Sequence, residues 1–270
     1  MTCGFSFNRL AQVLRWDVAA GWRGYMTGLC AAALILLMAF VMSSRNVGGD
    51  FVVLTDEARM EDKADFAVSA FVFAMVCGAS LTAFGLGDKA RRAACFMLPA
   101  TPLEKFVARC LQLTVGVGIL FVAAVAVADA LHFVFCLIVG TNGGLHSVFA
   151  LFAERLAHEV AEPFTRELEP GASNVVLGIY GIVAFVWLQS LMLVGSVLFS
   201  RYQLVITTIV LAVCWAVLAF LTYPFFRGPI PFAFFEVSAA VLPVLIVADY
   251  AVAYRLYRRM QLVGRKLINI

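Results

Sequence analysis

The sequence has 270 residues, of which 63% are hydrophobic and 14% charged, and its mean hydropathy is +0.95. Soluble globular proteins contain about 45–50% apolar and about 25% charged residues, so this composition excludes an ordinary soluble domain. The net charge of +3 is small, and because the basic residues flank apolar segments it does not indicate binding to nucleic acid.

The segment SFNRLAQVLRWDVAAGWRG, at residues 6–24, has the pattern of an amphipathic helix. Polar side chains separate the apolar ones, and Trp16 and Trp22 suit the headgroup layer of a bilayer. We therefore expect an interfacial N-terminal helix on the inner leaflet. The pattern alone leaves two roles open, a membrane anchor and a contact surface for a partner. The apolar face of this helix comprises Phe7, Leu10, Val13, Leu14 and Val18.

Apolar runs of about 20 residues are long enough to cross a bilayer as helices, since lipid offers the backbone no hydrogen-bond partner. The chain contains six such runs, which predict an all-α polytopic membrane protein organised as one transmembrane domain over residues 1–270. The first run reads as a retained helix and not as a cleavable signal peptide. The predicted spans are residues 24–43, 66–86, 111–138, 175–199, 203–223 and 232–254.

Lysine and arginine are distributed unevenly between the two sides that this topology creates. Fourteen of the 20 basic residues lie before the first span, in the loop at 87–110, in the turn at Arg201 or after the last span. The other six share their side with most of the acidic residues. Since basic residues concentrate on the cytoplasmic side, both termini are expected to be cytoplasmic.

Four ionisable residues fall within or at the ends of predicted spans, where such groups are costly and often functional. Asp129 and His132 lie near the outer end of the third span, where interfacial solvation is favoured over a shared polar site. Glu236 begins the sixth span. Asp249 lies near the inner end of that span, below Pro243, and a structural pair with an arginine is favoured over a role in a cavity.

The long outer loop at 141–174 contains apolar residues at helical spacing, which predicts an amphipathic helix that lies on the outer leaflet or caps the bundle. Its ERLAHE segment does not have the HExxH spacing of a zinc site, and GLGDKA at 85–90 is not a nucleotide-binding loop. The seven cysteines form no CxxC pair. We expect no metal, no cofactor and no catalytic residue in this chain, and so no enzymatic activity of its own.

The cytoplasmic loop at 87–110 contains the segment MLPATPLEKFVARC. Pro99 ends what precedes it, Thr101 can cap a helix, Pro102 suits the first helical position, and Glu104 follows the cap by three residues, which is the capping-box spacing. A well-formed helix therefore starts on the cytoplasmic face and runs through Lys105 and Arg109 into the third span. From the pattern, this segment is either a coupling element for a partner or an orderly start of that span.

FMLPATPLEKFVARC, together with FNRLAQVLRWD near the N-terminus, resembles the small permease subunits of type-2 ABC exporters, in particular a group common in Bacteroidota. Those proteins carry an LPAS/T-x-x-EK-like segment between their second and third spans. The matching positions here are Leu98, Pro99, Ala100, Thr101, Glu104 and Lys105.

This resemblance implies a role for residues 97–109 in coupling to a separate ATPase subunit that binds ATP and Mg²⁺. It also implies a dimer with a second permease copy or a paralogue, and a place in a bacterial cytoplasmic (inner) membrane. The expected function is ATP-driven export, with the substrate undetermined. The long outer loop between the third and fourth spans departs from the compact exporter pattern. The alternative is a membrane scaffold or assembly factor that does not transport.

Overall fold

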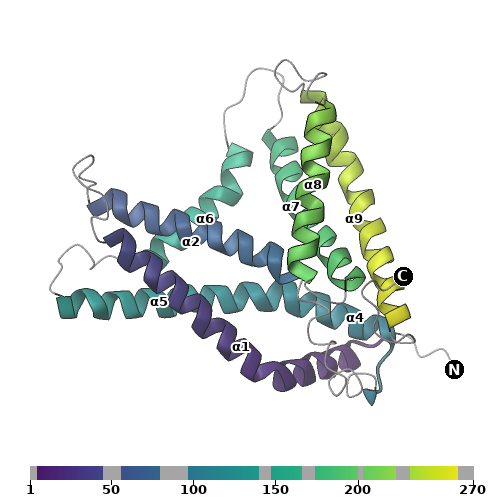
Figure 1. The fold of residues 1–270 in the computed structure, drawn as a ribbon, viewed down its shortest axis with the longest axis horizontal. Helices are drawn as coiled ribbons and strands as arrows, with labels where there is room; N and C mark the ends of the chain where they lie inside the picture. Colours follow the sequence, from purple (N-terminus) through teal and green to yellow (C-terminus); the bar gives the residue numbers. More distant parts are fainter. Residues whose placement is uncertain are drawn as a thin grey trace. The chain divides into compact units, whose positions relative to one another are not determined.

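The computed structural model describes residues 5–44, 56–79, 97–139, 147–165, 174–199, 203–222 and 232–260. Its regular elements are helices throughout this part of the chain, so the predicted all-α class is confirmed there (Figure 1). The helices are α1 (Phe7–Ser44), α2 (Asp56–Ala79), α4 (Pro102–Leu111), the π-helical turn η2 (Gln112–Gly116), α5 (Val117–Val139), α6 (Val148–Thr165), α7 (Asn174–Leu198), α8 (Gln203–Thr222) and α9 (Phe232–Met260).

Four helices in the described part of the chain are long and apolar enough to cross a membrane, which indicates an integral membrane protein. They coincide with the first, third, fourth and sixth predicted spans. The second and fifth predictions are not matched in this way. Residues 80–86 of the second lie outside the described residues, and the described apolar part of α8 is the shorter segment Leu204–Val213. The four are Phe7–Ser43, Pro102–Val139, Gly178–Leu198 and Val237–Arg259.

The N-terminal amphipathic segment and the first predicted span form one continuous helix, α1, and not a separate interfacial helix followed by a span. No proline interrupts the sequence between Phe7 and Ser44, and the helix continues through Gly21, Gly24 and Gly28. The third predicted span likewise continues from α4 through η2 into α5. In η2 the Thr114 hydroxyl donates to the carbonyl oxygen of Cys110 over 2.9 Å, a back-bond that accompanies the irregular turn.

The chain divides into two compact units. Unit 1 comprises residues 1–16, 75–114 and 162–270, and unit 2 comprises residues 17–74 and 115–161. The divisions fall within helices α1, α2 and α6 and within the π-helical turn η2.

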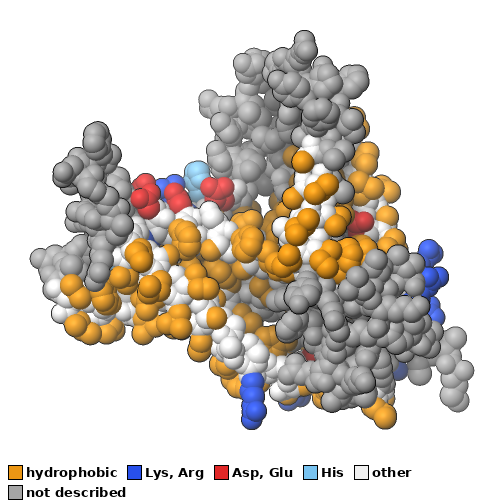
Figure 2. All heavy atoms as spheres, viewed as in Figure 1, with side chains coloured by type: hydrophobic (Ala, Val, Ile, Leu, Met, Phe, Trp, Pro, Cys, Tyr) orange, Lys and Arg blue, Asp and Glu red, His pale blue; other side chains and the backbone are white. Residues whose placement is uncertain are grey.

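Unit 2 has a core to which α1, α2, α5 and α6 all contribute, including Phe40, Val68, Phe121 and Phe152. Figure 2 shows charged side chains gathered over α2 and α6, whereas hydrophobic side chains cover the adjoining surface of this unit. The helix predicted in the outer loop is confirmed as α6. It packs its apolar face on the other helices of the unit, with Val148 and Phe152 buried.

Unit 1 is built around α7, which packs along α9 and against α8. Gly195 on α7 is needed for the second of these contacts, because a Cβ atom there would overlap the side chain of Thr207 on α8. Small residues allow helices to approach closely in lipid. By contrast, Cβ atoms at Gly24, Gly28 and Gly181 would meet nothing within 4 Å. The end of α2 joins this unit, where Val76 and Ala79 form a small core with Met192 of α7.

Candidate functional site at the start of helix α4

Helix α4 begins with the capping box that the sequence predicts. The Thr101 hydroxyl accepts the Glu104 N–H over 3.3 Å, and the Glu104 Oε2 accepts the Thr101 N–H over 2.8 Å. Thr101 is extended, with φ −66° and ψ 153°, and Pro102 occupies the first helical position. The four-residue signal therefore fixes where α4 starts.

The other oxygen of Glu104 reaches a second helix start, which the sequence does not predict. Its Oε1 accepts the backbone N–H of Ser6 over 2.8 Å and lies 3.2 Å from Nη2 of Arg9. Ser6 immediately precedes α1, and its carbonyl oxygen accepts the N–H of Leu10. One carboxylate thus binds orphan N–H groups ahead of two helices, where the helix dipoles favour negative charge.

The Glu104 side chain is completely buried, although it precedes the apolar stretch that starts at Leu111. Burial by itself disfavours a charged carboxylate. The hydrogen bonds from Thr101 and Ser6 and the neighbouring charge of Arg9 all favour the charged form. Directed donors on both oxygens therefore compensate for the burial of Glu104.

Apolar contacts on two sides of α4 complete this site, which we call the α4 junction. Toward α1, Ala108 packs against Leu10 and Val13. Toward α7 and α9, the Phe106 ring packs with its centroid 5.6 Å from that of Tyr254 and 5.5 Å from that of Tyr257. The start of α1, helix α4 and the ends of α7 and α9 thus form one packed unit.

The predicted coupling residues differ in burial, and the cap Thr101 is half-buried. Lys105 and Arg109 are buried along with Glu104, so they act within the chain. Pro99 and Pro102 are exposed. They lie beside two exposed apolar side chains, Met97 at 85% and Leu103 at 42% exposure. We call the exposed set the α4 tip; it consists of Met97, Pro99, Pro102 and Leu103. Residues 87–96 of the predicted loop lie outside the described residues.

Asp129 on α5, which is half-buried, holds the start of α6. The sequence did not predict this contact. Its Oδ1 accepts the N–H of Val148 over 3.0 Å, and its Oδ2 accepts the N–H of Phe149 over 3.3 Å and the hydroxyl of Ser147 over 2.8 Å. Ser147 also caps α6 locally, through the N–H of Ala150. Asp129 is thus an N-terminal cap supplied by another helix.

His132 is buried in unit 2, and Lys63 of α2 lies against it with its Nζ 3.3 Å from His132 Nε2. The ring also stacks edge-on against Phe40, with centroids 6.0 Å apart. The sequence analysis placed Lys63 on the outer side and did not predict that its side chain is buried against His132. A signal existed, because Lys63 falls on the same helical stripe as Met60 and Ala67, both of which are buried.

Asp249 on α9 accepts a hydrogen bond from the Ser190 hydroxyl of α7 over 2.8 Å. In the described part of the chain this partner replaces the arginine that we expected. Ser190 is buried, and its Oγ also lies 2.7 Å from the carbonyl oxygen of Trp187, so the two acceptors share one hydroxyl proton. The contact belongs to the packed seam between α7 and α9. Glu236 lies in the first turns of α9, and its side chain lies outside the described residues.

Comparison with known proteins adds no relative: no family model, curated protein or solved structure matches the chain.

Proposed function

We propose that this chain is the membrane-spanning subunit of an ATP-driven exporter of the type-2 ABC class, moved by a separate ATPase that docks on the α4 tip. In this proposal the chain spans the membrane six times, has both termini in the cytoplasm and works as a dimer in the bacterial inner membrane. The chain itself supplies no catalytic group.

The observation that carries the proposal is the contrast within residues 97–109. The α4 tip exposes Met97 and Leu103 to solvent, and the charges that follow are turned inward. Met97 and Pro99 precede the long helix Pro102–Val139, and Leu103 lies in its first turn. An exposed apolar projection at the start of a helix suits insertion into a groove of another protein. The two prolines stiffen the projection, because each fixes its own φ angle.

The α4 junction supports a mechanical role for this projection. A force on the tip passes into α4, and Phe106 is packed between the ends of α7 and α9. Glu104 also binds the start of α1 to the same point through Ser6 and Arg9. Displacement of α4 therefore acts on several helices of unit 1 together. A coupling element needs this rigidity, since a loosely held loop would absorb the motion.

Affinity purification in mild detergent tests the proposal, with bound proteins identified by mass spectrometry. We expect an ATPase subunit to co-purify with the wild type, and Leu103→Glu to lose it because the change places a charge in an apolar contact. Val160→Glu is the matched control, since Val160 is an exposed aliphatic residue of α6. The proposal fails if no ATPase is recovered, or if the two variants retain it equally. A non-transporting scaffold would instead recover other partners.

The side of the membrane on which the tip lies is tested separately. Met97→Cys, made in a background without the natural cysteines, should react with a membrane-impermeant thiol reagent only in inverted vesicles. Glu159→Cys on α6 should react only in right-side-out vesicles. Labelling of Met97→Cys from the periplasmic side would contradict the docking of a cytoplasmic ATPase there.

A further inference from the structure

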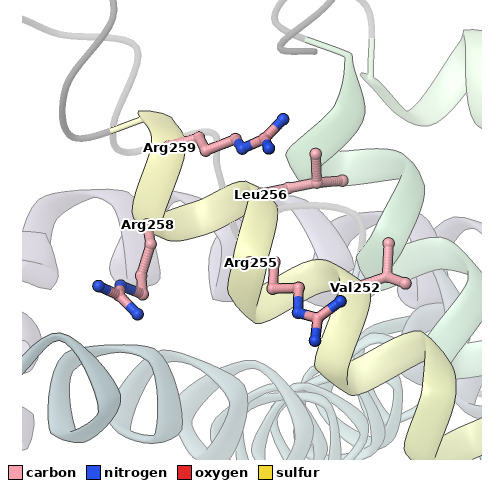
Figure 3. Close-up of a pocket in the computed structure, with 5 residues that line it drawn as sticks. All are labelled: Val252, Arg255, Leu256, Arg258 and Arg259. Carbon is pink, nitrogen blue, oxygen red and sulfur yellow. The ribbon is translucent and has the colours of Figure 1, made fainter.

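The C-terminal end of α9 borders a hollow with a volume of about 440 Å³. Two aliphatic side chains and three guanidinium groups line this hollow (Figure 3). Figure 3 shows Arg255 and Arg259 extending to the same side of the helix, whereas Arg258 extends to the other side. The lining residues are Val252, Arg255, Leu256, Arg258 and Arg259.

Within the residues that the structure describes, the packing of the helices does not use these three arginines. The inward face of α9 is formed by Ala253 and Tyr257, which are buried against α4 and α7. Arg255, Arg258 and Arg259 are exposed. Within the described part of the chain, none of the three makes an ion pair or a hydrogen bond through its guanidinium group. Arg255 and Arg259 lie one turn apart on the same side of α9, where like charges repel each other, so an anion placed between these two would be stabilising.

A continuous apolar stripe leads along α9 to these arginines. Val237, Val241, Val244 and Val252 share one helical face, and each is between 45% and 69% exposed. Arg255 and Arg259 continue the same face at helical spacing. From Val237 to Val252 the stripe rises by about 22 Å at 1.5 Å per residue. That length exceeds half of a hydrocarbon core about 30 Å thick, so the stripe can accompany one acyl chain through its leaflet.

We propose that the end of α9 is a binding site for one anionic phospholipid. The headgroup phosphate lies between Arg255 and Arg259, and an acyl chain follows the valine stripe. Arginine suits this role because its planar fork binds phosphate oxygens with two parallel hydrogen bonds. A free phosphate would contact the guanidinium groups only and would leave the valine stripe uncovered. An amphipathic anion contacts the guanidinium groups with its headgroup and the valine stripe with its acyl chain. The inference does not depend on the transport proposal.

Native mass spectrometry of the full chain in detergent tests this site, with phosphatidylglycerol and phosphatidylcholine as probes. We expect one phosphatidylglycerol per chain at low lipid concentration and no phosphatidylcholine. Arg255→Gln/Arg259→Gln should weaken the binding of phosphatidylglycerol by about thirtyfold, because two arginine–phosphate contacts are removed. The pair Arg15→Gln/Arg23→Gln removes the same charge from exposed positions on α1 and should bind like the wild type.

Equal binding of phosphatidylglycerol and phosphatidylcholine would refute the site. It would also be refuted if the glutamine pairs on α9 and on α1 lost the same amount of phosphatidylglycerol affinity, because that result would indicate a general effect of charge. Displacement of phosphatidylglycerol by millimolar glycerol phosphate would refute the lipid as ligand and assign a phosphate site instead. Arg255→Lys/Arg259→Lys keeps the charge without the fork, and we expect an intermediate affinity. If the glutamine pair unfolds in lipid-free detergent, the comparison between the lysine pair and wild type decides the outcome.

Discussion

Replacing Glu104 should loosen the start of α1, although the two segments are far apart in the sequence. In Glu104→Ala, the N–H groups of Ser6 and Thr101 each lose an acceptor, at a cost of about 1 kcal/mol or somewhat more each since both sites are only partly buried. The contact with Arg9 adds about 0.5–1 kcal/mol, because the arginine is 28% exposed. The sum is about 2–4 kcal/mol. Glu104→Gln keeps one acceptor oxygen and should cost about half as much.

Hydrogen exchange measured by mass spectrometry reports this change directly. A local loss of 2–4 kcal/mol corresponds to amide exchange about 30-fold to 1,000-fold faster in the peptide covering residues 7–16. Glu159→Gln is the matched control, because Glu159 is an exposed glutamate of α6 and should leave that peptide unchanged. If Glu104→Ala exchanges in residues 7–16 like the control, the carboxylate does not hold α1, and the α4 junction is wrongly described.

Further substitutions test the other contacts. Asp129→Asn should weaken the start of α6 by about 1–2 kcal/mol, seen as faster exchange in that helix only, and unchanged exchange would exclude the cap. Gly195→Val should lower the free energy of unfolding in mixed micelles by about 1–3 kcal/mol, because the new side chain overlaps Thr207; a neutral effect would contradict the close packing of α7 and α8. His132→Leu should destabilise unit 2 more than Lys63→Met, since only the former removes the imidazole from beside a buried ammonium group, and the reverse order would refute that contact.

The features that the sequence predicted well are those encoded by near neighbours in the chain. The capping box at Thr101 and Glu104 needs four residues, and each of its hydrogen bonds closes within them. The apolar face of α6 is likewise a periodic pattern. Four of the six predicted spans are matched by helices that are long and apolar enough, because composition over 20 residues dominates the free energy of a helix in lipid.

The features that the sequence did not reveal depend on partners distant in the chain. Glu104 was identified as a local cap, but its second oxygen binds Ser6, 98 positions away. Asp129 and Val148 are 19 positions apart. Patterns of neighbouring residues do not predict that a carboxylate in one helix will bind the first N–H groups of the next helix. The continuity of α1 was missed for a different reason: amphipathic character before Gly24 indicated a change of environment, and that does not require a break in the helix.

ATP hydrolysis by the reconstituted complex tests the central claim most directly. The partner ATPase would be assayed in nanodiscs with the wild-type chain, with Leu103→Glu and with the control Val160→Glu. The account predicts that wild type and control stimulate hydrolysis equally, and that Leu103→Glu does not stimulate it although the protein is inserted and folded. The account would be contradicted if Leu103→Glu stimulated hydrolysis as much as the wild type, or if the rate of hydrolysis were the same with and without the chain.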